Sequence, residues 1–162
     1  MRTFLILRHA KAAREESGSD KERELTAKGR HSAERMGALA REHDLVPDLV
    51  ICSTATRARE TYNLFARGAG YDGRVEFLDE LYLAPAVLYV EAVQRLGGSA
   101  KKVMVIGHNP GLEALVDVLT GSAETLATAA LAVCELPVDE WADLDGKVQG
   151  SLKGLFRPIE ID

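Results

Sequence analysis

Short, uninterrupted runs of apolar residues recur along this chain, and two of them are followed within two residues by a histidine. Phe4–Leu7 is followed by Arg8-His9, and Val103–Ile106 is followed by Gly107-His108. Such runs, without polar alternation, are typical of strands buried on both faces. The Gly-His-Asn-Pro-Gly sequence after the second run has the composition of a tight turn into a helix. We therefore expect His108 at the carboxyl end of a central strand, where ligands bind in open α/β sheets.

Segments between the apolar runs repeat their apolar positions with helical spacing. Residues 26–43 predict a helix capped by Thr26, with its buried stripe at i, i+3, i+4 and i+7. The same reasoning predicts a helix to about residue 67, capped by Ser53 or Thr54. Two more helices are predicted, over 86–96 and from the Asn109-Pro110 turn to 119. The remaining apolar runs predict strands at 49–52, 75–77, 129–136 and 152–156.

Strands that alternate with helices over the first 120 residues predict an α/β fold. We expect a three-layer α/β/α sandwich with a mostly parallel sheet. The last two strands are separated by no long helix, which favours an antiparallel edge. The 162 residues carry no repeat or linker and predict a single domain over 1–162. Residues 10–24 form a long polar loop after His9, either a functional loop or a solvated connector.

Charge and cysteine content narrow the function classes. The net charge of −5 argues against a broad nucleic-acid-binding surface, although a local cationic pocket remains compatible with it. Cys52 and Cys134 each lie in an apolar run and are interpreted as buried thiols. The sequence shows no signal peptide and no apolar run long enough to cross a membrane, so we expect a cytoplasmic protein without membrane partners. A monomer is the default expectation.

The predicted sheet collects two histidines and two arginines at one edge. Arg8, His9 and His108 follow strand ends, and Arg57 begins a helix. Arginine forks match phosphate oxygens, and helix N-termini add positive potential there. A neutral imidazole can attack phosphorus and form a covalent intermediate, while the remaining groups stabilise the equatorial oxygens. The pattern predicts phosphoryl-transfer chemistry.

Each of these residues also has an ordinary structural interpretation. A strand-end histidine can simply be hydrogen-bonded, and an arginine can be a surface charge. A zinc site would need three or four nitrogen, sulfur or carboxylate ligands, whereas the neighbours here are arginines, which repel cations. We therefore expect no metal and no cofactor, and the functional interpretation rests on the combination of residues.

Four motifs in order resemble the histidine phosphatase superfamily, also called the phosphoglycerate mutase-like family, over nearly the whole chain. They are Leu7-Arg8-His9-Ala10, Leu25-Thr26-Ala27-Lys28-Gly29, Ser53-Thr54-Ala55-Thr56-Arg57-Ala58-Arg59-Glu60-Thr61 and Gly107-His108-Asn109-Pro110. The resemblance implies a phosphoglycerate mutase-like fold and a phosphohistidine intermediate on His9.

The resemblance also implies roles for individual residues. Arg8, Arg57 and His108 would form the phosphate pocket, and Glu80 falls where larger members carry their general acid. Asn109, within the second histidine motif, and Lys11, which adds positive charge near the phosphate, complete the expected substrate-binding set. Ala10 replaces the usual glycine. Lys11 stands where mutases often have an acidic or amide residue, which disfavours a sugar-phosphate mutase.

The chain lacks the long insertions that form a substrate lid in larger members, and in this it is similar to compact SixA-type protein phosphohistidine phosphatases. The resemblance thus implies a metal-independent phosphatase acting on phosphohistidine in a partner protein. Two alternatives stay open. One is a small-molecule phosphomonoesterase of the same mechanism, acting on a phosphorylated metabolite. The other is a non-catalytic module that binds phosphate or a phosphoprotein.

Overall fold

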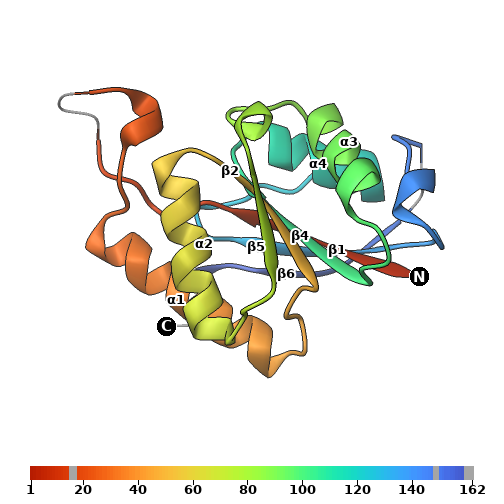
Figure 1. The fold of residues 1–162 in the computed structure, drawn as a ribbon, viewed down its shortest axis with the longest axis horizontal. Coiled ribbons are helices and arrows are strands. Elements are labelled where there is room, and N and C mark those ends of the chain that lie inside the picture. Colours follow the sequence, from red (N-terminus) through yellow and green to blue (C-terminus); the bar gives the residue numbers. More distant parts are fainter. Residues whose placement is uncertain (15–17, 148–149, 159–162) are drawn as a thin grey trace.

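A single six-stranded sheet forms the middle of the molecule, with helices on both faces (Figure 1). The computed structural model describes residues 1–14, 18–147 and 150–158. The strands are β1 (Arg2–Arg8), β2 (Leu49–Ser53), β3 (Arg74–Leu78), β4 (Lys102–Gly107), β5 (Leu131–Leu136) and β6 (Ser151–Phe156). The helices are α1 (Ala27–Glu42), α2 (Thr56–Ala69), α3 (Ala86–Leu96) and α4 (Gly111–Thr120), with short 3₁₀ turns η1 (Asp20–Glu22), η2 (Asp79–Leu81) and η3 (Trp141–Asp143).

The strand order is β3-β2-β4-β1-β5-β6. The first four strands along the chain pair in parallel, β5 pairs antiparallel with β1, and β6 pairs antiparallel with β5. This confirms the predicted mostly parallel sheet with an antiparallel edge. The parallel strands β1 and β4 lie in the centre, so their carboxyl ends meet at one edge of the sheet.

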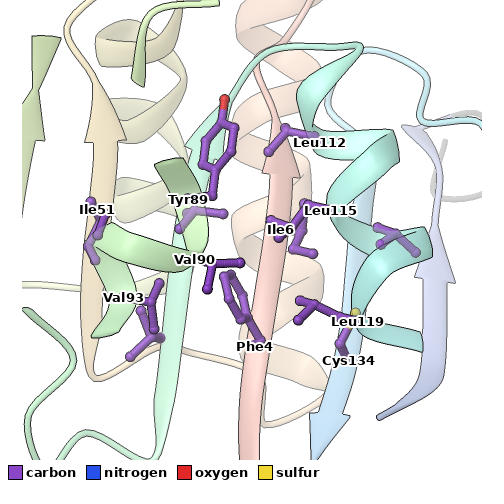
Figure 2. Close-up of a cluster of buried hydrophobic side chains, with 14 of the residues drawn as sticks. Phe4, Ile6, Ile51, Tyr89, Val90, Val93, Leu112, Leu115, Leu119 and Cys134 are labelled. Atoms are coloured by element: carbon purple, nitrogen blue, oxygen red, sulfur yellow. The ribbon is translucent and has the colours of Figure 1, made fainter. Parts of the chain in front are cut away.

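Alternating side chains of the central strands build two cores. In β1, Phe4 and Ile6 pack with α3 and α4, while Leu5 and Leu7 pack with α1 and α2. Because successive strand residues point to opposite faces, an unbroken apolar run fills both layers at once. Figure 2 shows the first of these cores, in which Tyr89 and Val90 of α3 and Leu115 of α4 pack against the sheet.

One local prediction is wrong: neither Ser53 nor Thr54 caps α2. The N-cap residue is Ala55, which makes no side-chain cap bond. The hydroxyl of Ser53 instead accepts from the Ala55 N–H at 3.2 Å and lies 2.8 Å from a ring nitrogen of His108, while Thr54 donates to Asp79 at 2.6 Å. Both hydroxyls therefore form hydrogen bonds with other residues at the edge of the sheet and do not cap the helix. Thr26 does cap α1, accepting from the Gly29 N–H at 2.9 Å.

The sequence predicts no membrane-spanning segment, and the helices of the structure can be compared with that prediction. Within the described ranges, every helix is too short or too polar to cross a bilayer. Cys52 and Cys134 are both buried and free, as predicted.

We expect a Gly111→Ala substitution to destabilise the fold. A Cβ atom at Gly111, the first residue of α4, would lie 1.9 Å from the main-chain oxygen of Ala84, so backbone must move. Overpacking of this kind costs about 1–3 kcal/mol in the free energy of unfolding, measurable by urea titration. The matched control is Gly146→Ala, whose Cβ would meet only Val118 at 3.8 Å. Equal stability of the two variants would contradict the close approach of α4 to Ala84.

Candidate active site

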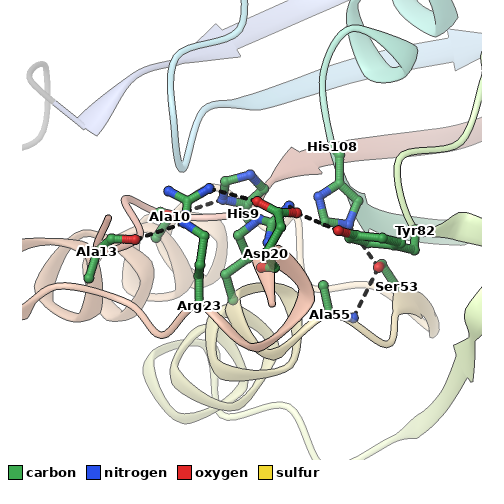
Figure 3. A network of polar contacts seen from close by, with 10 residues as sticks. His9, Ala10, Ala13, Asp20, Arg23, Ser53, Ala55, Tyr82 and His108 are labelled. Atoms are coloured by element: carbon green, nitrogen blue, oxygen red, sulfur yellow. Dashed lines mark hydrogen bonds and ion pairs between the residues drawn. The ribbon is translucent and has the colours of Figure 1, made fainter. Parts of the chain in front are cut away.

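Two histidine rings face one another at the carboxyl edge of the sheet. His9 follows β1 and His108 follows β4, and the parallel register pairs Arg8 with Gly107. A bond from the His9 N–H to the Gly107 oxygen, 3.1 Å long, continues this pairing. The ring centroids lie 5.3 Å apart at an interplanar angle of 52° (Figure 3). His9 is 8% exposed and His108 only 1%.

Two arginines bring positive charge to the same place. Arg57, 3% exposed, lies in the first turn of α2, and Arg8 is the last residue of β1. One terminal nitrogen of Arg8 donates to the Leu126 oxygen at 3.0 Å. Both arginines act electrostatically on both histidines. The structure thus brings Arg8, His9, Arg57 and His108 together, as expected from the ends of the elements that carry them.

A main-chain oxygen determines which nitrogen of His9 is available. Nδ1 lies 2.8 Å from the oxygen of Ala10, the next residue. Since a carbonyl oxygen only accepts, Nδ1 carries a proton and the neutral ring keeps its lone pair on Nε2. Nε2 is therefore the ring nitrogen whose lone pair is available to a bound group. The contact of Nδ1 is made by the backbone oxygen of Ala10 and not by its side chain.

Hydroxyl groups orient the second histidine. The His108 N–H donates to the Tyr89 hydroxyl at 3.1 Å, and Nε2 of the ring lies 2.8 Å from Ser53 Oγ. Ser53 Oγ already accepts from the Ala55 N–H, so its own hydrogen is free to go to Nε2. When the Ser53 hydroxyl donates to Nε2, the proton of the neutral His108 ring lies on Nδ1, where it can be donated.

Burial and positive neighbours keep both rings neutral. Burial first, and then the positive charges of Arg57, Arg8 and Arg23, lower the pKa of His9 to about 4, although the hydrogen bond to Ala10 opposes this shift. Burial, the neighbouring His9 and Arg57 lower the pKa of His108 to about 3, and Asp20 opposes this. A neutral imidazole is the form that can attack phosphorus.

Unpartnered polar atoms mark where a ligand fits. In the described part of the chain, four buried side-chain atoms lack a hydrogen-bond partner: Arg8 Nε, Arg57 Nε, His108 Nδ1 and Asn109 Oδ1. All four atoms belong to residues that the sequence analysis predicts as site residues, and the first three atoms are nitrogens that can donate. Native proteins rarely leave buried donors unsatisfied, and exceptions are concentrated at functional sites. Buried N–H donors of this kind are the groups that bind the oxygens of a phosphoryl group.

A carboxylate from the polar loop lies across the arginine. Arg57 donates from Nη1 to the Asp20 main-chain oxygen at 2.7 Å and from Nη2 to Oδ2 at 3.0 Å. The Tyr82 hydroxyl also donates to Oδ2, and Arg23 donates to Oδ1 at 3.1 Å (Figure 3). The bonds from Tyr82, Arg23 and Arg57 hold the pKa of Asp20 at about 2, so the group stays anionic. An anion that binds Arg57 must exchange with this carboxylate.

Sequence reasoning missed Asp20, Arg23 and Tyr82. Each is a single polar residue in a loop or turn, and no spacing rule distinguishes it from a solvated neighbour. For Asp20 and Arg23 the available signal was the length of the polar segment 10–24 beside His9. Ser53 was nominated only as a helix cap, whereas its hydroxyl contacts His108.

The remaining nominated residues lie around this centre in different ways. Asn109 donates from its amide to the Leu126 oxygen at 2.9 Å, which also holds Arg8. Lys11 is exposed, and its main-chain oxygen accepts from the Thr26 N–H at 2.9 Å. Glu80, on η2, forms an ion pair with Arg95 at 3.0 Å, and no hydrogen bond or ion pair among the described residues joins it to either histidine. A proton-donor role for Glu80 stays a prediction.

Comparison with known proteins relates the chain to a family. The model of the histidine phosphatase superfamily (branch 1) matches residues 4–82. An uncharacterised protein of Mycobacterium tuberculosis is 33% identical over 80% of this chain and 79% of its own length.

Solved structures match over almost the full chain. One, from Nakamurella multipartita and assigned as phosphohistidine phosphatase SixA, has a TM-score of 0.86 and 28% identity, covering 98% of this chain and 96% of its own. Another with the same assignment, from Agrobacterium tumefaciens, has a TM-score of 0.83 and 27% identity, with 97% and 98% covered.

We expect NMR titration to find His9 and His108 neutral across the range between about pH 5 and 8 in which histidine ordinarily titrates. Their midpoints should lie near 4 and 3, because burial and the arginines disfavour the protonated rings. The unfolded chain takes up both protons near pH 6.5, so the free energy of unfolding should fall as pH drops from there towards 4. Imidazole ¹⁵N chemical shifts, assigned with single His→Gln variants, report the two midpoints. A midpoint near 6.5 for either ring would contradict the arrangement.

We expect Asp20→Asn to tighten binding of inorganic phosphate, since it removes the anion that competes for Arg57. Because one partly exposed charge contact is removed, the Kd for phosphate should fall roughly three- to tenfold. Isothermal titration calorimetry measures this change. Glu22→Gln is the matched control, because it removes the same charge from an exposed residue of the same turn. Weaker phosphate binding by Asp20→Asn would show that Asp20 supports the anion site.

Proposed function

The chain belongs to branch 1 of the histidine phosphatase superfamily and is a phosphatase, and from this premise we propose that it hydrolyses phosphohistidine in a partner protein through a phosphohistidine intermediate on His9. The observation that carries the proposal is the set of buried, unpartnered donors on Arg8, Arg57 and His108 around a neutral, oriented His9.

In the first step, His9 Nε2 attacks the phosphorus of the substrate. A P–N bond to Nε2 forms while the P–N bond to the substrate histidine breaks. With its other ring nitrogen protonated, the substrate histidine leaves as a neutral imidazole. In the second step, water attacks the phosphorus and His9 becomes the leaving group. The Nδ1–H bond to the Ala10 oxygen keeps the second nitrogen of His9 protonated, so His9 also leaves as a neutral imidazole.

Charge on the transferring group would be held by donors already in place. Arg8, Arg57 and the Nδ1–H of His108 would supply these donors, since both arginines act electrostatically on both histidines and the burial of the unpartnered atoms strengthens each contact. The two guanidinium groups supply the positive charge that metal ions supply in other phosphatases, so the proposed reaction is metal-independent.

Two observations favour phosphohistidine as the substrate. The similar structures from Nakamurella multipartita and Agrobacterium tumefaciens, which align over nearly their whole length, are assigned as phosphohistidine phosphatases. In addition, the ring-protonated imidazole of a phosphohistidine leaves without help from a strong general acid. This fits a site in which Asp20 is held ionised and Glu80 is paired with Arg95.

Mixing the protein with a ³²P-phosphohistidine carrier protein should transfer label to His9 and release phosphate, with or without a chelator. His9→Ala should lose the labelled enzyme and roughly 10³-fold or more in kcat/KM. His43→Ala, which changes an exposed histidine at the end of α1, is the control and should keep both.

Three results would contradict the proposal. Persistence of label in His9→Ala would mean that the nucleophile is another residue. Turnover of sugar or aryl phosphates in clear preference to phosphohistidine would point to the small-molecule phosphomonoesterase. Saturable binding of the phosphoprotein without phosphate release would point to the non-catalytic module.

A further inference from the structure

A cavity lies beside the histidine site. It has a volume of about 460 Å³. Its described lining, here called the basic cavity, consists of Lys11, Lys28, Ser32, Ala127, Thr128, Arg157 and Pro158. None of these residues has been given a role in the chemistry at His9, apart from the expectation that Lys11 binds substrate.

The basic cavity shares a wall with the proposed catalytic centre. The loop residue Leu126 accepts hydrogen bonds from Arg8 and Asn109 on the catalytic side, and Ala127 and Thr128 follow it into the cavity lining. The N–H of Ala129 then donates to the His9 oxygen at 3.0 Å. Lys11 lies two residues after His9, at most about 7 Å along the chain. A polypeptide bound at His9 can therefore reach the cavity within a few residues.

Close packing of α1 against the segment after His9 brings the two lysines into one lining. A Cβ at Gly29 would lie 2.2 Å from the Lys11 oxygen, so only glycine permits this approach. Lys28 lies directly before Gly29 in the first turn of α1, and both lysines are exposed. No ion pair among the described residues engages either ammonium group.

The charge of the basic cavity is opposite to that of the whole chain. Three cations and no carboxylate are found among its described lining residues, in a protein of net charge −5. Lys28 also lies where a helix disfavours it: the amino end of α1 is the positive end of the helix dipole, and its first turn contains no acidic residue. The cations of the cavity lining are thus concentrated at one place, and Lys28 is unfavourable to its own helix. An anionic ligand would offset both effects.

We propose that the basic cavity binds an acidic stretch of the protein that carries the phosphohistidine. This inference rests on the proposed function and adds to it the chemistry by which a partner is selected. Carboxylate side chains would approach Lys11, Lys28 and Arg157, while the small side chains of Ala127 and Pro158 accept the apolar parts of the partner. Charge complementarity of this kind favours encounter and selects among partners.

A pair of synthetic peptides tests this proposal. Both carry one phosphohistidine, flanked either by Asp and Glu or by Asn and Gln. The native enzyme should show a kcat/KM roughly three- to tenfold higher for the acidic peptide, and added salt should reduce that ratio. Lys28→Glu should bring the ratio to one or below. An acidic residue is favoured in the first turn of a helix, so this variant is expected to fold.

Lys101→Glu is the matched control. It makes the same charge reversal at an exposed lysine next to the amino end of β4, the edge of the sheet opposite the site, and should keep the native ratio. Equal rates for the two peptides with the native enzyme, or an unchanged ratio in Lys28→Glu, would overturn the proposal.

A binding measurement separates this proposal from the reaction itself. Fluorescence anisotropy with the unphosphorylated acidic peptide reports on the basic cavity whether or not phosphohistidine is hydrolysed. Binding that is lost in Lys28→Glu and kept in Lys101→Glu supports the cavity as an acidic-peptide site, even if neither peptide is turned over and the proposed function fails. Hydrolysis of both phosphorylated peptides, without binding of the acidic peptide, overturns the cavity proposal and leaves the proposed function intact.

Discussion

β1 and β4 run parallel in the middle of the sheet, and the arrangement at the site depends on that pairing. The register sets Arg8 opposite Gly107, so the next residue of each strand is a histidine and the two rings meet. The residues joined in this way are about a hundred positions apart in the sequence. Their alignment is stabilised by the two cores on either face, since each central strand contributes alternate side chains to both.

The site combines buried cations with neutral imidazoles, an arrangement that is electrostatically unfavourable without an anion. Arg57 is almost fully buried and would be costly without a partner. The carboxylate of Asp20 supplies that partner, held by Tyr82 and Arg23 on its other side. Phosphate carries the same kind of charge with more oxygens, so an exchange of Asp20 for phosphate keeps the arginine neutralised throughout.

The same edge of the sheet carries a second concentration of positive charge. The loop from Leu126 to Ala129 holds Arg8, Asn109 and the backbone of His9 on one side and lines the basic cavity on the other. A reactive centre and a neighbouring recognition surface would thus be built on one connecting segment. In an acidic protein this localises attraction for an anionic partner at the face where the chemistry occurs.

Sequence by itself determined the elements and the residues that carry charge and nucleophilicity. Unbroken apolar runs identified β1 and β4 as buried strands, and the histidines that follow them were predicted to share an edge because parallel strands end together. Tertiary structure decided what no local pattern encodes: that Ser53 orients His108 rather than capping α2, that Asp20 lies on Arg57, and that Glu80 faces Arg95. The physical reason is that hydrophobic periodicity reports burial over several residues, whereas the partner of one polar side chain is set by the packing of segments distant in sequence.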